Sequence, residues 1–265
     1  MDFGLKGKIA LVSGGSKGMG RAAAEELARE GAHVLVLARG QEAIDETVAA
    51  IRASGGVAEG LSADMTDPAS IAGALAHCKD RLGGEPEIAV ANVYGTARLS
   101  FDSAKPDDFR AGYEMLVLSA LHLAHAVVPG MKKRGWGRIV TIGSFCVKKP
   151  HWHIPLIVDN VTRAAAAALN KSLSNELGEH GITVNTIAPG FIATEMALAW
   201  MAELAREQGL DPAAAAAALD ATIPLKRQGT QEEIGAAVAF LCSQRASYIT
   251  GQMIMVDGGL VGAPY

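Results

Sequence analysis

The sequence has few of the residues that assign a chain to a specialised class of protein. Its three cysteines, Cys78, Cys146 and Cys242, are odd in number and far apart. They predict neither a disulfide framework nor a metal site, and we expect no bound metal. A reducing, cytoplasmic environment is therefore expected.

Neither sign of charge dominates, and no long apolar run is present. The 24 basic and 28 acidic residues give a net charge of −4, whereas a nucleic-acid surface needs a clustered basic excess. No run approaches the roughly 18 apolar residues that span a membrane, and residues 1–8 lack the apolar core of a signal peptide. We therefore expect neither nucleic acid nor a membrane as a partner.

What the sequence does contain is a high content of hydrophobic residues, 49% of 265, in short runs that alternate with amphipathic stretches. Strands that are apolar on both faces and alternate with helices predict a parallel sheet covered on both sides. We therefore expect an α/β fold in one domain, residues 1–265, with a doubly wound (Rossmann) sheet of about seven strands. The strand runs are Ile9–Val12, Val34–Leu37, Val57–Leu61, Ile88–Ala91, Arg138–Ile142, Thr183–Ile187 and Met253–Val256. The helical stretches are Ala22–Arg29, Glu42–Ala53, Ile71–Arg81, Asp107–Arg134 and Thr162–Glu179.

The segment 193–222 interrupts this alternation. It carries Trp200, Met201 and Leu204, then Asp211-Pro212 and a run of alanines with high helix propensity. Open α/β sheets bind ligands outside the carboxyl ends of their strands. The segment is predicted to be a small helical lid over a substrate, although an ordinary packed helical pair fits the same pattern.

A glycine-rich turn follows the first predicted strand. Residues 13–20 read SGGSKGMG and lead into a helical stretch. Glycines leave no side chain between backbone and ligand, and the helix start presents free N–H groups to a phosphate. This context predicts a site for the pyrophosphate of a dinucleotide.

The spacing of these glycines, G-x-x-x-G-x-G, resembles the short-chain dehydrogenase/reductase family, and the resemblance covers the whole chain. It implies a nicotinamide cofactor held by the turn and by segments after later strands. It also implies that Gly251–Gly259 forms a last strand of the kind that packs in a homotetramer, so a homo-oligomer is expected. The implied cofactor-binding residues are Gly14, Ser16, Lys17, Gly18, Met19, Gly20, Arg39, Asp64, Met65, Asn92, Arg163, Pro189, Gly190, Ile192 and Thr194.

Charge at the end of the second predicted strand bears on which cofactor is bound. An acidic residue there would bond the ribose 2′-hydroxyl of NAD, whereas a basic residue accommodates the 2′-phosphate of NADP. The chain has Arg39 at this point, and Lys17 lies in the glycine turn. The two cations predict NADP(H), although both could also be solvated surface residues.

The resemblance implies an atypical catalytic site. Members of the family carry an Asn, a Ser and a Tyr-x-x-x-Lys pair, in which the tyrosine is the acid. Here Ser144 matches the serine, but Asp159 and Arg163 stand at the Tyr and Lys positions, and the Asn position falls near Leu116. The chain is similar in this to a subgroup described as 3-oxoacyl-carrier-protein reductase-like.

The residues at the Tyr and Lys positions cannot act as the family's pair. Arg163 stays protonated near neutral pH, so it cannot relay a proton, although it can bind ribose hydroxyls. Asp159 lies four residues earlier and can pair with it, which makes the carboxylate a poor acid at pH 7. A ketone reduction therefore needs another proton donor.

Four other residues are candidates for that donor. Tyr94 follows the fourth predicted strand, His153 lies in the loop after Ser144 together with His151, and Lys148 lies in the same loop. Each could equally be part of a pocket wall or a solvated loop.

Two classes of function remain open. The first is an NADP(H)-dependent oxidoreductase that reduces a ketone, a 3-oxoacyl compound or a conjugated carbonyl. In the last case hydride goes to carbon, and Ser144 and Lys148 could hold the oxyanion. The second is a cofactor-binding protein with little turnover, a sensor or an assembly partner. The substrate is expected to be a largely apolar small molecule.

Overall fold

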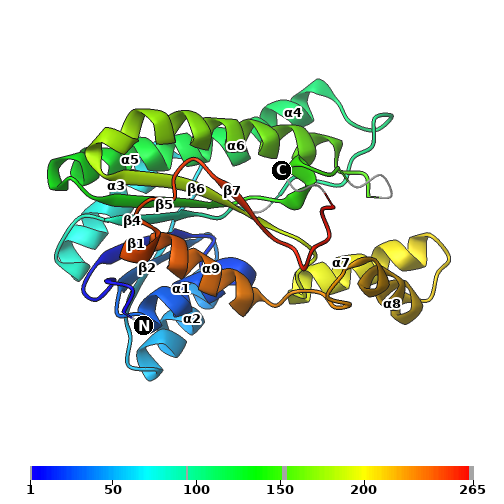
Figure 1. Cartoon of the computed structure of the whole chain (residues 1–265), viewed down its shortest axis with the longest axis horizontal. Helices are drawn as coiled ribbons and strands as arrows, with labels where there is room; N and C mark the ends of the chain where they lie inside the picture. The colour runs from blue at the N-terminus through cyan, green and yellow to red at the C-terminus, as the bar shows by residue number, and fades with distance from the viewer. Residues whose placement is uncertain (1, 94, 151–153, 263–265) are drawn as a thin grey trace.

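The computed structural model describes residues 2–93, 95–150 and 154–262, which fold around one seven-stranded parallel sheet (Figure 1). The strand order is β3-β2-β1-β4-β5-β6-β7. The strands are β1 (Ile9–Ser13), β2 (His33–Ala38), β3 (Val57–Ser62), β4 (Ile88–Ala91), β5 (Gly137–Ile142), β6 (Ile182–Pro189) and β7 (Met253–Val256). All seven predicted strands are confirmed to within two residues at their ends, and the predicted doubly wound sheet is confirmed with them.

Helices cover both faces of the sheet, as predicted. One face carries α1 (Gly18–Arg29), α2 (Gln41–Ala53) and α9 (Gln231–Cys242). The other carries α3 (Pro68–His77), α4 (Pro106–Tyr113), α5 (Ser119–Arg134) and α6 (Ile157–Leu177). A further pair, α7 (Glu195–Glu207) and α8 (Pro212–Thr222), projects from the body after β6 (Figure 1).

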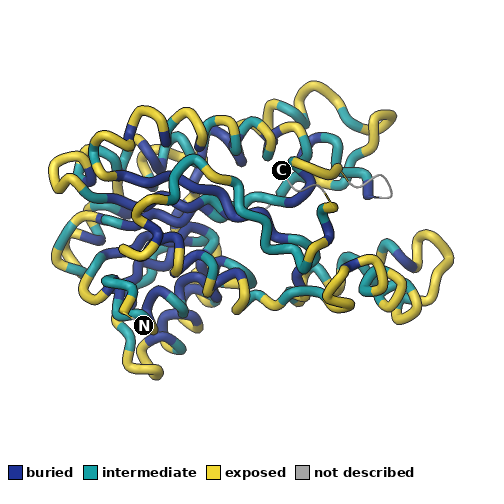
Figure 2. The backbone as a smooth tube through the Cα atoms, viewed as in Figure 1, coloured by how far each residue is buried: buried dark blue, intermediate teal, exposed yellow. Residues whose placement is uncertain are grey.

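The strands are apolar throughout because each face of the sheet has its own core. In β1, Ala10 and Val12 join the cluster under α1, α2 and α9, while Ile9 and Leu11 join the cluster under α3 and α5. Alternate side chains of a strand point to opposite faces, so burial on both sides requires an uninterrupted apolar run. Figure 2 shows the result as a buried sheet inside a more exposed shell of helices.

Helix α9 is absent from the sequence-based prediction. It packs against α1 so closely that a Cβ at Gly235 would lie 2.6 Å from the carbonyl oxygen of Ala22. Its start carries a capping box, in which Thr230 accepts from the Glu233 amide and Glu233 from the Thr230 amide. This box, followed by Ile234 and Val238, was the sequence signal for the helix.

The same cap predicts a pH-dependent stability. Hydrogen bonds from Arg227 and from the Thr230 amide lower the pKa of Glu233 from 4.5 to about 2. A carboxyl with a lower pKa in the folded state contributes stability above its unfolded pKa and loses it as the pH falls. We expect Glu233→Gln to flatten the loss of stability between pH 4.5 and 2 in urea unfolding. If the variant loses as much stability between pH 4.5 and 2 as the unaltered protein, the prediction is wrong. Glu46→Gln, at an exposed position on α2, is the control.

Among the residues that the structure describes, one helix is long and apolar enough to cross a membrane by length and composition alone. It is the continuous helix Pro106–Arg134, which includes α4, a π-helical turn at Glu114–Leu118 and α5, and its most apolar 18 residues have a mean hydropathy of 1.4. The sequence has no uninterrupted apolar run in this helix, because His122 and His125 divide the apolar residues. In the structure α5 packs on β4 and β5, as a helix covering a sheet does.

Strand order also fixes where a ligand can bind. From β1 the chain proceeds outward to β2 and β3, and then returns to the other side of β1 to form β4. The connections after β1 and β4 therefore leave toward opposite faces and open a crevice at the carboxyl edge of the sheet.

Candidate functional site

The turn after β1 has the conformation that a phosphate site requires. Gly14 and Gly18 have φ angles of +56° and +55°, which side chains disfavour. A Cβ at Gly20 would lie 2.1 Å from the Gly14 carbonyl oxygen, so only glycine lets α1 start this close to the turn. The unpaired amides at the start of α1 then face the crevice, as an anion site needs.

Hydrogen bonds hold this turn against the next strand. Asn92, just after β4, donates from its side chain to the carbonyl oxygen of Gly14 at 3.1 Å. The Ser13 hydroxyl accepts from the Asn92 amide at 3.0 Å. On the other side, Thr47 of α2 donates to the Ser16 carbonyl oxygen at 3.0 Å. These hydrogen bonds bring the predicted residues of the turn and Asn92 together and hold the turn in place.

Cations lie where a 2′-phosphate would be expected. Arg39 follows β2 directly, Lys17 caps the start of α1, and both side chains are exposed. Asp64 follows β3 and is exposed, while its neighbour Met65 is buried. Hydrogen bonds from Thr66, with a smaller contribution from the charge of Arg39, lower the pKa of Asp64, so this carboxylate is ionised beside the cation.

The segment after β6 closes the crevice from the other side. Pro189 ends β6, Gly190 donates its amide to the Val256 carbonyl oxygen, and Ile192 is buried. Thr194 caps the start of α7, accepting from the Ala197 amide at 3.2 Å. Its methyl group lies 3.5 Å from the position of a Cβ on Gly18, so it lies directly over the glycine turn.

Ser144 stands at the carboxyl end of β5, beside the crevice. It is extended, partly exposed, and its Oγ accepts from the Cys146 amide at 3.2 Å, which fixes the side chain. Accepting this bond leaves its own O–H as a donor. The Ser144 hydroxyl therefore keeps its hydrogen available at the edge of the crevice.

Asp159 and Arg163 form the ion pair that their spacing predicts. The Arg163 Nε donates to Asp159 Oδ2 at 2.6 Å, and both side chains are nearly buried, 13% and 9% exposed. The other carboxylate oxygen, Oδ1, accepts from the Thr96 amide at 3.0 Å. Both oxygens of Asp159 are therefore occupied as acceptors from protein groups.

Arg163 connects this pair to the serine. Its Nη1 donates to the Gly143 carbonyl oxygen at 3.3 Å, one residue before Ser144. Nη2 is left as the terminal nitrogen without a hydrogen bond to the described residues, so it could still contact a ribose.

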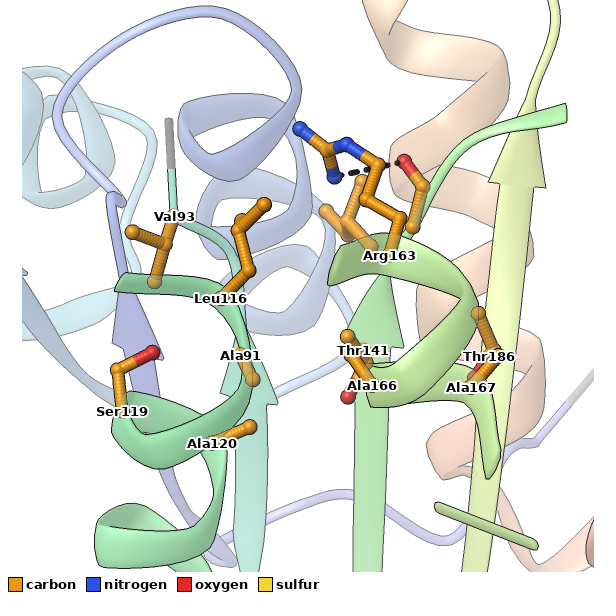
Figure 3. Close-up of a pocket in the computed structure, with 12 residues that line it drawn as sticks. Ala91, Val93, Leu116, Ser119, Ala120, Thr141, Arg163, Ala166, Ala167 and Thr186 are labelled. Atoms are coloured by element: carbon orange, nitrogen blue, oxygen red, sulfur yellow. Dashed lines mark hydrogen bonds between the residues drawn. The ribbon is translucent and has the colours of Figure 1, made fainter. Parts of the chain in front are cut away.

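A narrow pocket lies beside Arg163, between α5 and α6 over the ends of β4 and β5 (Figure 3). Apolar residues dominate its lining, and Leu116 of the π-helical turn projects into it. Leu116 is the residue nearest the family's Asn position, so this wall offers no side-chain amide. The Thr141 hydroxyl is buried beside it and has no hydrogen-bond partner among the described residues.

The candidate proton donors are only partly placed. Lys148 is exposed at the end of the short helix Phe145–Val147, four residues after Ser144. Tyr94, His151 and His153 lie outside the described residues. Their roles stay predictions.

The structure adds residues that sequence reasoning missed. The Thr96 amide completes the environment of Asp159, and Gly95 lies so close that a Cβ there would be 2.7 Å from Asp159 Oδ1. No pattern in the sequence indicates that residues 95 and 159 meet, because only the order of β4 and β5 in the sheet brings them together. Within the described part of the chain, no group of three His, Cys, Asp or Glu could hold a metal.

Comparisons with known proteins agree with this geometry. A family profile described as Enoyl-(Acyl carrier protein) reductase matches residues 14–261. The chain is 37% identical over 256 residues to the 3-oxoacyl-[acyl-carrier-protein] reductase FabG of Salmonella typhimurium, covering 97% of this chain and 98% of the relative.

Solved structures give the same answer for the fold. L-sorbose reductase from Gluconobacter frateurii, complexed with NADPH and L-sorbose, superposes with a TM-score of 0.92 at 32% identity, covering 99% of this chain and 100% of that one. YwfH, an NADPH-dependent reductase involved in bacilysin biosynthesis, superposes with a TM-score of 0.90 at 29% identity, covering 97% and 99%. The glycine turn, the serine after β5 and these full-length matches together show that the chain belongs to the short-chain dehydrogenase/reductase family and is an oxidoreductase of that type.

Proposed function

We propose that the protein uses NADP(H) to reduce a largely apolar carbonyl or conjugated carbonyl compound. The observation that carries this proposal is the placement of Ser144 and the glycine turn at the same carboxyl edge of the sheet. The cofactor would supply hydride, and Ser144 would donate a hydrogen bond to the oxygen that gains negative charge.

Several parts of the crevice fit a dinucleotide. The amides at the start of α1 fit its pyrophosphate, and Gly14 and Gly20 let the turn, Asn92 and the start of α1 pack closely enough to present them. Arg39 and Lys17 would hold the 2′-phosphate, and Thr194 with the residues after β6 would hold the nicotinamide end. The free Nη2 of Arg163 would contact a ribose hydroxyl.

The environment of Asp159 favours a conjugated substrate among the three classes. Because both its oxygens accept hydrogen bonds, Asp159 does not replace the acid that a simple ketone needs. In conjugate reduction hydride goes to the β-carbon and leaves an enolate, whose oxygen Ser144 would hold while water supplies the proton to the α-carbon. The names of the relatives include both an enoyl and a 3-oxoacyl reductase, so a 3-oxoacyl substrate, with Tyr94, His153 or Lys148 as the donor, is the second candidate.

The surroundings of Ser144 support an apolar substrate. Phe145 and Phe191 pack with their ring centroids 5.1 Å apart, in one cluster with Ile223 and Leu260. A second cavity shares Phe191 and Met255 with this cluster, and its remaining lining includes both apolar residues and the charged Arg227, Glu233 and Asp257. Apolar walls with a few polar groups are typical of small-molecule sites.

NADPH oxidation against matched ketones, 3-oxoacyl thioesters and enones tests the proposal. We expect turnover of enones, with the product identified by the position of deuterium transferred from labelled NADPH. Tight NADPH binding without turnover of any compound would instead support a cofactor-binding protein that acts as a sensor or an assembly partner.

The choice of cofactor gives a separate prediction. Arg39→Gln is expected to weaken NADPH binding by roughly tenfold or more and to leave NADH binding nearly unchanged, because a hydrogen bond to a charged group contributes about 1.5–3 kcal/mol. Calorimetric titration with both cofactors measures this. Arg52→Gln, on α2 away from the turn, is the matched control. Tighter binding of NADH than of NADPH by the unaltered protein would reverse the assignment.

The remaining expectations belong to the same proposal. We infer a homo-oligomer in the cytoplasm, acting on a small molecule, with neither nucleic acid nor a membrane as a partner. The relatives' family membership supports the oligomer, and sedimentation of the purified protein measures it.

A further inference from the structure

The segment 95–99 after β4, here called the strap, connects the proposed active site to α7. It is tied to α6 at two points. The Thr96 amide donates to Asp159, and the Ile157 amide donates to the Leu99 carbonyl oxygen at 3.2 Å. The strap is thus fixed on the side of Ser144, and its position does not depend on α7.

Between these two anchors, Arg98 points to α7. Its Nη2 lies 3.4 Å from Glu203 Oε2 and its Nη1 lies 3.4 Å from Glu207 Oε2. Its guanidinium is centred 5.4 Å from the ring centroid of Trp200. Residues 200, 203 and 207 are three and four apart and so share one face of the helix, which is the face turned to the strap.

Few other contacts hold α7 and α8 to the body. Ala205 is the buried residue of α7, no residue of α8 is buried, and the two helices pack chiefly against each other. Figure 2 shows both as largely exposed. Met196 and Leu198 are about half exposed although they are apolar. A pair of helices bound so lightly can move as a unit.

The two ends of α7 are held by different parts of the site. Its first turn begins at Thr194, over Gly18 of the glycine turn, and its last two turns reach Arg98 on the strap. A 13-residue helix is about 20 Å long, so α7 spans from the proposed cofactor site to the strap. Release of the Arg98 end would free α7 to pivot about residues 190–194.

We propose that Arg98 is a positioning residue, the latch that holds α7 closed over the substrate through Trp200, Glu203 and Glu207. This proposal rests on the proposed function, since it assigns how that site is closed. The glutamates are more than half exposed and the contacts are long, so the latch opens easily and is screened by salt.

Steady-state kinetics of Arg98→Gln test the latch. We expect KM for the substrate to rise only about five- to tenfold, because exposed ion pairs and a cation–π contact are individually weak. The Kd for NADPH should stay unchanged. Between 0.05 and 0.5 M NaCl, KM should rise in the unaltered protein but not in the variant. Arg98→Lys should retain part of the effect. Arg110→Gln, on α4, is the control.

A double-mutant cycle shows whether the glutamates are the partners. Glu203→Gln/Glu207→Gln should raise KM as Arg98→Gln does, and the triple variant should be no worse than either. Additive effects, or a change in NADPH affinity alone, would overturn the proposal.

Trypsin gives a readout that needs no turnover. Arg206 lies exposed in the last turn of α7, so we expect cleavage after it to be several-fold faster in Arg98→Gln and unchanged in Arg110→Gln. Equal cleavage in all three proteins would refute the latch. A protein that reduces no substrate but still shows faster cleavage would refute the proposed function and retain the latch.

Discussion

Replacing Ser144 by alanine is expected to lower kcat by about two to three orders of magnitude, the loss seen when one donor to a developing oxyanion is removed. The structure places this hydroxyl at the end of β5 with its orientation fixed by the Cys146 amide. Because the bond to the substrate oxygen strengthens as charge develops, kcat should fall more than KM rises. Single-turnover measurement of NADPH oxidation separates this step from product release.

Two further variants make the result specific. Ser144→Thr keeps a hydroxyl at the same position and should recover part of the rate. Ser172→Ala, on the exposed side of α6, should leave the rate unchanged. Turnover of Ser144→Ala at the rate of the unaltered protein would show that the reaction takes place elsewhere.

Replacing Asp159 by alanine is expected to destabilise the protein by about 3–5 kcal/mol, the cost of leaving a buried charge without its partner. Arg163 would lose the carboxylate at 2.6 Å, and the Thr96 amide would lose its acceptor. The midpoint of urea unfolding measures this loss. A change under 1 kcal/mol would show that the pair is not what holds these segments together.

The double variant distinguishes a structural pair from an acid. Asp159→Leu/Arg163→Met removes both charges, and well-packed apolar residues often replace a buried ion pair with little loss. We therefore expect the double variant to recover most of the stability lost by Asp159→Ala. If Asp159 were the proton donor, turnover would stay lost in the double variant although the fold is restored. If it is structural, the remaining rate should be set by loss of the Arg163 contacts to Gly143 and to the cofactor ribose.

Asp159→Tyr/Arg163→Lys, which would place the residues usual in the family at these positions, is expected to change more than the two side chains. Gly95 lies so close to Asp159 that a Cβ on it would be 2.7 Å from Oδ1, so we expect the larger side chain of a tyrosine at 159 to press on this loop. The strap would have to move, and with it Arg98. The aspartate and the close glycine therefore fit each other as a unit.

The sequence determined much of the architecture. Runs such as Ile88–Ala91 are apolar at every position and too short for helices, so burial on both faces of a parallel sheet accounts for them. The glycine turn is similarly determined, because Gly14 has a positive φ angle and Gly20 has no room for a Cβ beside the Gly14 carbonyl oxygen. Helix α9 is not among the predicted helices, although its capping box at Thr230 and Glu233 stands in the sequence.

Local sequence could not determine which strand ends lie side by side. The spacing of Asp159 and Arg163 predicts their ion pair, because four residues make one turn of helix. The Thr96 amide lies 63 residues from Asp159 in the sequence, and the Gly143 carbonyl group lies 20 residues from Arg163. Arg98 lies 105 and 109 residues from Glu203 and Glu207, and strand order brings these segments together. The order of apolar and polar residues along a helix or strand depends on which of its faces is buried, so the sequence alone predicts these elements. The contacts of the site depend on how β4, β5 and β6 are ordered and how α6 and α7 then pack on them, and only the tertiary structure decides that.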